Sequence, residues 1–310
     1  MGLLVNGKWV DKWYDTKASK GKFKREQSKF RQWIKQDGST PFLPESGRYH
    51  LYVSLACPWA HRTLIFRKIK ELEDLIDISI VDPVMLENGW EFKDTEGSIP
   101  DSVNGANYLY EIYLKADPEY TGRVTVPVLW DKKTNTIVNN ESSEIIRMFN
   151  SEFNHLTGNM LDFYTEELRG EIEKINLYIY RNINNGVYKA GFATTQKAYN
   201  EAFEKLFTAL DKIESDLKDR EFLLGSTITE ADWRLFTTLI RFDPVYVGHF
   251  KCNKKRIADY PALSKYLDRL INYPGVKETI NIDHIKTHYY VSHRTINPTG
   301  IVPSGPELNF

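Results

Sequence analysis

The sequence predicts an α/β domain followed by an all-helical domain. In the first half of the chain, short segments with alternating apolar and polar residues, rich in β-branched and aromatic side chains, are followed by segments with apolar residues at helical spacing. From about residue 161 onward only the helical spacing remains. The 310 residues are enough for two domains of about 100 to 200 residues each, and a hydrophobic content of 41% supports ordinary cores.

The first half opens with residues 1–47, which are expected to form an irregular extension rich in Lys, Trp and Phe. A strand is predicted at 49–53 from its alternating pattern, and a helix at 63–72 from its apolar spacing. The segment 77–82 predicts a second strand, parallel to the first because a helix connects them. The α/β domain is predicted to cover residues 48–155.

A long segment rich in Gly, Asn and Asp interrupts this domain at residues 86–122, with helical character at 108–114. Connections of this length are usually functional or mobile. A β-hairpin is predicted at 124–138, followed by a helix at 143–149 that residues 139–142 cap. The order β-α-β and then β-β-α is that of a thioredoxin-like domain.

The all-helical domain is predicted to cover residues 161–310. Thr229 and Asp232 form a helix start similar to a capping box. A thioredoxin-like domain followed by an all-helical domain is the architecture of glutathione transferases. The predicted helices are 166–179, 195–218, 229–242 and 262–272.

Cys57 stands between the first predicted strand and the first helix, directly before Pro58. Proline is favoured at the first helical position, so Cys57 is expected beside free backbone N–H groups at the positive end of the helix dipole. Such surroundings lower the pKa of a thiol and favour a nucleophile over a buried structural cysteine. Because Ala60 stands where a second cysteine of the motif would be, an outside thiol must resolve any mixed disulfide on Cys57.

Composition excludes several classes of function. Cys57 and Cys252 are the only cysteines, too few for a disulfide framework, which fits a reducing, cytoplasmic location. Cys252 lacks the strand and helix context and is expected to be structural. The net charge of −1, with both signs interspersed, argues against a nucleic-acid partner. No apolar run reaches the roughly 18 residues of a membrane span.

Seven motifs follow one another along nearly the whole chain. In this order they resemble one branch of the glutathione transferases, the glutathionyl-hydroquinone reductases, also called the Xi class and related to the Omega class. The motifs are Cys57-Pro-Trp-Ala-His-Arg62, Asn88-Gly-Trp90, Gly122-Arg-Val-Thr-Val-Pro-Val-Leu-Trp-Asp131, Asn139-Asn-Glu-Ser142, Asn184-Asn-Gly-Val-Tyr-Lys-Ala-Gly-Phe192, Arg241-Phe-Asp-Pro-Val-Tyr-Val247 and His288-Tyr-Tyr290.

The resemblance implies an enzyme that removes glutathione from S-glutathionyl-hydroquinones through a mixed disulfide between Cys57 and glutathione. A second glutathione is the co-substrate, and the products are free hydroquinone and glutathione disulfide. No metal and no bound redox cofactor are implied. The implied partners are glutathione, aromatic hydroquinone conjugates and a second copy of the chain in a homodimer.

The resemblance also implies the glutathione-binding residues. Val126 is expected to offer its backbone to the tripeptide, before a Pro127 peptide bond that is cis in thioredoxin-like folds. Glu141 and Ser142, at a helix N-terminus, are expected to bind the γ-glutamyl amine and carboxylate. Ser142 as a helix cap alone, and Pro127 as the mark of an edge strand, are the structural alternatives.

Four further residues of the resemblance have roles around the tripeptide. Arg123 and the N–H groups of Val124 and Thr125 are placed for its other polar ends. Trp90 is expected to be exposed on the long insertion and to cover glutathione with its indole, the alternative being a core aromatic.

Cleavage of a carbon–sulfur bond needs acid–base help, because an aryl carbanion is a very poor leaving group. The resemblance assigns proton transfer at the ring to Tyr188. It places the hydroxyls of Tyr246 and Tyr289 near the thiol, where they lower its pKa or bind the ring oxygens. In isolation each of these tyrosines would be a packing residue.

Two alternatives stay open at the level of sequence. An Omega-like thiol transferase or dehydroascorbate reductase would use the same Cys57, but its substrates need no ring protonation. A non-enzymatic, transferase-like binding module is the other alternative, against which the intact Cys57 and the pair Glu141 and Ser142 argue.

Overall fold

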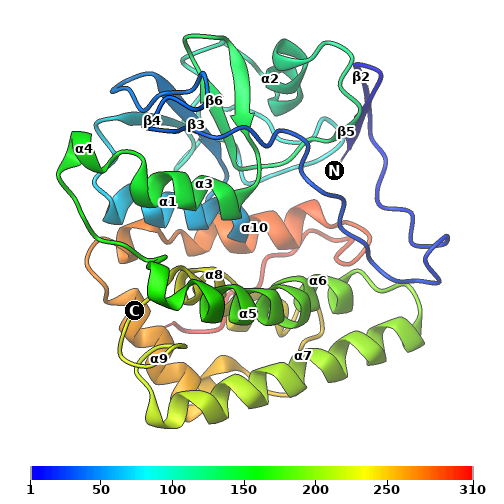
Figure 1. The fold of residues 1–310 in the computed structure, drawn as a ribbon. Coiled ribbons are helices and arrows are strands. Elements are labelled where there is room, and N and C mark those ends of the chain that lie inside the picture. Colours follow the sequence, from blue (N-terminus) through cyan, green and yellow to red (C-terminus); the bar gives the residue numbers. More distant parts are fainter. Residues whose placement is uncertain (1, 309–310) are drawn as a thin grey trace.

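The computed structural model describes residues 2–308 and contains an α/β domain packed on an all-helical domain (Figure 1). A four-stranded sheet has the order β4-β3-β6-β7. Strand β3 pairs in parallel with β4 and antiparallel with β6, and β6 pairs antiparallel with β7. The thioredoxin-like prediction is confirmed. The strands are β3 (Tyr49–Val53), β4 (Ile76–Ile80), β6 (Val128–Asp131) and β7 (Thr136–Asn139).

Three helices accompany this sheet. Helix α1 (Pro58–Ile69) begins at Pro58, as its proline predicts, and α3 (Ser142–Ser151) packs beside it between the sheet and the helical domain (Figure 1). Helix α2 (Leu109–Ala116) confirms the helical character expected in the long insertion. Residues 124–127, expected in a strand, lie outside one, because Pro127 has no N–H to donate to a strand ladder.

The prediction that residues 1–47 are irregular is wrong at the N-terminus. Strands β1 (Leu3–Val5) and β2 (Lys8–Val10) form a hairpin, and β1 also pairs with β5 (Gly122–Arg123) of the long insertion. Asn6 and Gly7 make the turn with φ of 46° and 73°. This turn type requires positive φ at both central residues, which is why Asn-Gly is itself a hairpin signal.

The helical domain contains the four predicted helices, with ends that lie within three residues of the predicted ones. The capping box of Thr229 and Asp232 is confirmed. A π-helical segment precedes α6 and another follows α8, and helices α4, α6 and α10 were not predicted from apolar spacing. The bounds are α4 (Asn154–Thr157), α5 (Arg169–Ile179), α6 (Asn185–Gly191), α7 (Gln196–Asp216), α8 (Glu230–Leu239), α9 (Pro261–Ile271) and α10 (Ile282–Ser292), with the π-helical segments Tyr180–Asn184 and Phe242–Tyr246.

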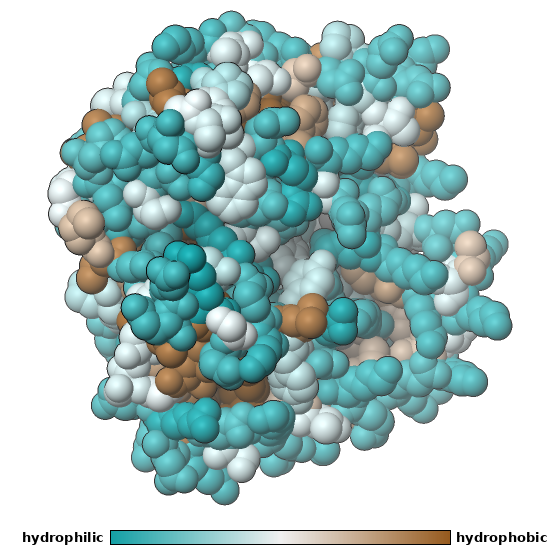
Figure 2. Space-filling model, in the orientation of Figure 1, coloured by the Kyte–Doolittle hydropathy of each residue, from teal (hydrophilic) through white to brown (hydrophobic). Residues whose placement is uncertain are grey.

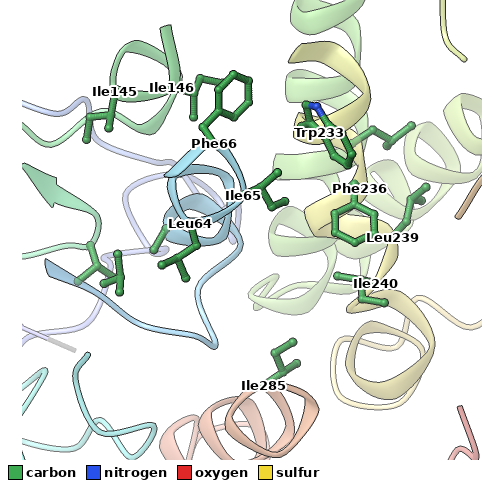
Figure 3. Packing of buried hydrophobic residues seen from close by; sticks show 14 of the residues in the cluster. Leu64, Ile65, Phe66, Ile145, Ile146, Trp233, Phe236, Leu239, Ile240 and Ile285 are labelled. Carbon is green, nitrogen blue, oxygen red and sulfur yellow. The ribbon is translucent and has the colours of Figure 1, made fainter. Parts of the chain in front are cut away.

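Helix α1 is the centre of the core that the two domains share. Most of its side chains are buried, as expected for a helix with partners on several faces. Figure 3 shows Ile65 of α1 between α3 on one side and Trp233 and Phe236 of α8 on the other. Since Cys57 directly precedes α1, this packing fixes the position of the thiol relative to both domains.

The surface gives no sign of a membrane span. Within residues 2–308, no helix is long and apolar enough to cross a bilayer. The face drawn in Figure 2 is mostly hydrophilic, with its largest apolar area at the lower left and single apolar residues elsewhere.

Replacing Ile65 by Ala should lower the free energy of unfolding by about 2 to 5 kcal/mol, because it leaves a cavity in this shared core. Leu177→Ala is the matched control, since Leu177 is 48% exposed on α5 and should change stability by about 0.5 kcal/mol or less. Denaturant unfolding of both variants measures the difference. Equal losses would mean that α1 is not the centre of the shared core.

Candidate active site

The thiol of Cys57 lies where the two domains meet. Cys57 is the N-cap residue of α1 and Pro58 its first helical residue, as the sequence predicts. The S–H donates to the carbonyl of Val126 across 3.7 Å. The peptide bond between Val126 and Pro127 is cis, as expected. Cys57 and Cys252 are both free thiols, and Cys252 is buried.

The expected lowering of the Cys57 pKa is not what the structure shows. Burial raises the pKa of the Cys57 thiol. The N–H groups of Ala60 and Trp59 and the charges of Arg241 and Arg25 act in the opposite direction. The sequence showed the helix N-terminus but not the desolvation, which comes from the packing of the helical domain over α1.

Arg241 holds the backbone that leads into Cys57. Its guanidinium, fully buried, donates from Nε to the Ala56 carbonyl at 2.8 Å and from Nη2 to the Leu55 carbonyl at 3.0 Å. Nη1 donates to the carbonyl of Thr237 at 2.8 Å, and no carboxylate of residues 2–308 pairs with this cation. Isolated buried charges are costly, so an uncompensated guanidinium beside a thiol is suited to stabilise a thiolate.

The same guanidinium sets the state of His61. Because an arginine nitrogen can only donate, Nδ1 of His61 accepts from Nη1 of Arg241 at 3.0 Å. Nε2 of His61 therefore carries the proton and donates to Thr279 Oγ1 at 2.8 Å. Burial and the Arg241 charge lower the pKa of His61, which keeps the imidazole neutral.

A polar cavity of about 280 Å³ lies beside Cys57 and holds most of the residues that the sequence assigned to glutathione. Arg123, Thr125, Val126, Glu141 and Ser142 line it, and Val124 lines the neighbouring cavity described below. The structure therefore brings together residues from the loop before β6 and from the start of α3.

A tyrosine hydroxyl joins these two parts of the polar cavity. Tyr113 of α2 donates to the carbonyl of Thr125 at 2.8 Å and accepts from the N–H of Thr125 and the amide of Asn140. The N–H of Thr125, expected to face glutathione, is thus engaged by Tyr113. The sequence gave no sign of this role, because Tyr113 lies in a helix with ordinary core spacing.

Glu141 and Ser142 begin helix α3 but differ in what they do. Glu141 is the cap, since its carboxylate accepts from the N–H of Ser143 at 3.1 Å, and it also accepts from the hydroxyl of Ser28 at 3.2 Å. Ser142 is the first helical residue, so the alternative of Ser142 as the helix cap is wrong. Its hydroxyl accepts from Nη1 of Arg62 at 3.4 Å.

Arg62 is a cation that the sequence analysis did not assign to the site. It is buried, with its guanidinium 4.6 Å from the centroid of the Trp59 ring. Burial and the nearby charge of Arg234 lower the pKa of Arg62 to about 9. Its position in the Cys57 motif, one helical turn after Pro58, is the signal that points to it.

Trp90 is buried, not exposed as expected from its Gly/Asn-rich setting. Only 5% of it is accessible, and its ring stacks on His288 of α10 with a centroid distance of 4.7 Å. Gly89 before it has a φ of 75°, and a side chain there would meet the ring of Trp9. The N-terminal hairpin and α10 thus hold the Trp90 loop from both sides.

A second, smaller cavity of about 70 Å³ shares Trp59 and Val126 with the first, has Cys57 in its own lining and is mainly aromatic. It is smaller than the ~150 Å³ cavity that holds a benzene ring in an engineered protein interior. An aromatic ring bound here would therefore extend toward the polar cavity. The lining includes Cys57, Trp59, Trp90, Val124, Tyr188, Phe192, His288, Tyr289 and His293.

The three tyrosines singled out in the sequence form one hydrogen-bonded group. The Tyr289 hydroxyl lies 2.6 Å from that of Tyr188 and 3.1 Å from that of Tyr246. Tyr188 and Tyr289 line the aromatic cavity, whereas Tyr246 lies behind Tyr289 and lines neither cavity. Burial raises the pKa of all three phenols, which keeps them protonated as donors.

Residues 12–30, here called the N-terminal strap, lie over both cavities. Tyr14 and Arg25 line both of them, and the guanidinium of Arg123 lies 4.1 Å from the centroid of the Tyr14 ring. Arg123 also donates to the carbonyl of Lys12 and lies 3.5 Å from the carboxylate of Glu26. The extension that the sequence left without a role is therefore part of the site.

No group of three or more His, Cys, Asp or Glu side chains within residues 2–308 is arranged to hold a metal ion.

Comparisons with known proteins match this architecture. The family model "Glutathione S-transferase, N-terminal domain" matches residues 56–152, and "Glutathione S-transferase, C-terminal domain" matches residues 196–269. The fold and the site thus define a protein of the glutathione S-transferase type.

Similar proteins narrow this class. Glutathionyl-hydroquinone reductase YqjG of Escherichia coli (strain K12) is 55% identical over 313 residues, which cover 99% of this chain and 95% of YqjG. Glutathionyl-hydroquinone reductase PcpF of Sphingobium chlorophenolicum is 55% identical over 306 residues, which cover 99% of this chain and 96% of PcpF.

Solved structures agree with the sequence relatives. The glutathione-bound structure of YqjG matches with a TM-score of 0.91 and 51% identity, covering 99% of this chain and 96% of that one. The glutathione-S-transferase Xi from Phanerochaete chrysosporium matches with a TM-score of 0.90 and 54% identity, covering 92% and 97%. The chain belongs to the glutathionyl-hydroquinone reductases, the Xi class of the glutathione S-transferases.

Replacing Arg241 by Met should raise the pKa of Cys57 further, because it removes a cation that opposes the effect of burial. The rate of alkylation by iodoacetamide, measured against pH, should then have its midpoint at a higher pH than in the wild type. Arg241→Lys, which keeps the charge, should shift the midpoint less. Arg256→Met, at an exposed arginine of the helical domain, is the control. An unchanged midpoint in Arg241→Met would contradict an electrostatic role for Arg241.

Proposed function

We propose that this chain removes glutathione from S-glutathionyl-hydroquinones and passes it to a second glutathione. The observation that carries the proposal is the position of Cys57, in the wall of an aromatic cavity that hydrogen-bonded tyrosines line and that shares Trp59 and Val126 with a polar cavity. The polar cavity suits a charged tripeptide and the aromatic cavity suits a quinol ring. The names of YqjG and PcpF support the same activity.

The tripeptide is proposed to bind along Val126 with its γ-glutamyl end at the start of α3. The carboxylate of Glu141 suits the amine of that end, and the N–H groups at the helix start suit its carboxylate. Arg62, behind Ser142, adds positive charge at the same place. The roles of Trp90, Arg123, Val124 and Thr125 in covering or binding the tripeptide stay predictions.

In the first step the Cys57 thiolate attacks the glutathione sulfur of the conjugate. A sulfur–sulfur bond forms and the bond from sulfur to the ring carbon breaks. If the conjugate reacts as its keto tautomer, the electron pair flows through the ring to the quinol oxygen, which takes up a proton. Tyr188 is proposed to move the proton at the ring, and Tyr289 and Tyr246 to hold its hydroxyl in place.

In the second step another glutathione attacks the mixed disulfide on Cys57. Glutathione disulfide leaves, and the Cys57 thiolate is restored. The cycle needs no second cysteine, consistent with Ala60 in the motif and with the buried position of Cys252.

The direct test is to mix the protein with a glutathionyl-hydroquinone and glutathione, and to measure free hydroquinone and glutathione disulfide together. Both should appear in equal amounts. Cys57→Ser should abolish both products while glutathione binding survives, because the clamp residues lie elsewhere. Near-wild-type turnover by Cys57→Ser would rule out the thiol mechanism.

Replacing Tyr188 by Phe separates this activity from an Omega-like thiol transferase. Carbon–sulfur cleavage needs proton transfer at the ring, so activity on glutathionyl-hydroquinones should fall by about 10²-fold. Activity on a small mixed disulfide should be nearly unchanged, since that substrate has a good leaving group. Equal losses on both substrates would instead give Tyr188 a packing role, and no loss on either would favour the thiol transferase.

We also propose that the protein is cytoplasmic and forms a homodimer. Each chain has an α/β domain at residues 48–155 and an all-helical domain at residues 161–310. Light scattering of the purified protein tests the assembly.

A further inference from the structure

In the second step of the reaction, a second glutathione attacks the mixed disulfide on Cys57. The chemistry of this step restricts where that glutathione can lie, and the inference rests on the proposed function. A thiolate attacks a disulfide along the sulfur–sulfur axis, from the side opposite the leaving sulfur. The incoming sulfur must therefore approach from the place that the ring carbon occupied in the first step. That place is the aromatic cavity, which Cys57, Tyr188 and Tyr289 line.

Electrostatic repulsion between the incoming glutathione and the mixed disulfide opposes this approach unless a further cation is present. Each glutathione carries two carboxylates and one ammonium, so the mixed disulfide and the incoming thiolate both have net negative charge. Like charges brought together in a partly buried site repel strongly. The site therefore needs a cation that the first tripeptide does not occupy, at the border of the two cavities.

Arg25 of the N-terminal strap lies at this border. It lines both cavities, with its guanidinium 4.8 Å from the centroid of the Trp59 ring and 4.9 Å from that of Tyr188. Its Nε donates to Asn185 Oδ1 at 2.9 Å. Within residues 2–308, its two terminal nitrogens have no hydrogen bond and no ion pair. The planar guanidinium is thus held in place through Nε, while its two terminal nitrogens are available to bind a carboxylate.

The other cations that line the polar cavity already have partners within the described chain. Arg62 donates to Ser142 and Asn184, and Arg123 lies against Glu26. Arg31 pairs with Glu144, Arg234 pairs with Glu230, and Lys29 donates to the carbonyl of Thr121.

We propose that the second glutathione binds at the mouth between the two cavities, with one of its carboxylates held by the guanidinium of Arg25. The thiol of this glutathione loses its proton to solvent, and its sulfur forms a bond with the glutathione sulfur of the mixed disulfide. The bond from that sulfur to Cys57 breaks, and Cys57 leaves as the thiolate. Glutathione disulfide then departs through the same mouth.

The test isolates this half-reaction. The Cys57–glutathione disulfide is formed with glutathione disulfide, excess reagent is removed, and the protein is mixed with either glutathione or 2-mercaptoethanol. Loss of the adduct is followed by intact-mass spectrometry after acid quenching. In Arg25→Met the rate constant for glutathione should fall about tenfold more than that for uncharged 2-mercaptoethanol, since about tenfold is the scale of one charge-assisted hydrogen bond and 2-mercaptoethanol reports only the lost charge near the Cys57 thiolate.

Two further variants complete the design. Arg25→Lys keeps the charge without the planar fork and should lose less than Arg25→Met. Lys24→Met, at the exposed cation one residue earlier in the strap, should match the wild type with both thiols. Adduct formation itself reports that each variant has kept its reactive Cys57.

Several results would overturn the inference. Equal losses with glutathione and 2-mercaptoethanol would mean that Arg25 acts only on the thiolate of Cys57, and no loss with either would place the second glutathione elsewhere. An equal slowing of adduct formation from a glutathionyl-hydroquinone would assign Arg25 to the first tripeptide. Wild-type protein that resolves the mixed disulfide but releases no hydroquinone would contradict only the proposed function.

Discussion

The active site depends on the contact that the buried Arg241 makes with the turn before Cys57. One guanidinium from the helical domain holds two successive carbonyls, those of Leu55 and Ala56, and a third carbonyl in α8. The thiol therefore has its position only when both domains are folded and docked. Because no carboxylate of the described residues neutralises this cation, the same contact that positions Cys57 also supplies positive charge to it.

Desolvation around Cys57 has opposite consequences for the two kinds of acid in the site. It raises the pKa of the thiol and makes the thiolate harder to form, which Arg241, Arg25 and the N–H groups at the start of α1 oppose. It also raises the pKa of Tyr188 and Tyr289, and phenols that remain protonated suit the proton transfer at the ring that we propose. In the proposed mechanism, the desolvated thiol of Cys57 therefore needs fixed cations beside it, whereas the phenols need none.

The parts of this molecule that sequence predicts are those with local causes. Alternating apolar residues predicted the strands of the sheet, and helical apolar spacing predicted the long helices. The Cys57-Pro58 junction predicted the position of Cys57 at a helix start. Burial comes from distant packing, so the exposure of Trp90 and the pKa of Cys57 were predicted wrongly. His288 stacks on Trp90, and Trp9 lies close to the neighbouring Gly89, both from segments far away in the chain. Arg25 and Tyr113 carry no local signal, since their importance arises only where the strap and α2 meet the site.

The N-terminal strap supplies a cation, Arg25, that a transferase binding a single glutathione would not need. In the proposed function, the first tripeptide binds along the loop at Val126 and at the start of α3, both within the α/β domain. A cycle that brings two anionic tripeptides to the same sulfur requires a cation on the opposite side, and the helical domain at this border offers tyrosines and other neutral rings. In our proposal Arg25 meets this requirement, with its guanidinium over the rings of Trp59 of one domain and Tyr188 of the other. Its position therefore depends on the docking of both domains, as the position of Cys57 does.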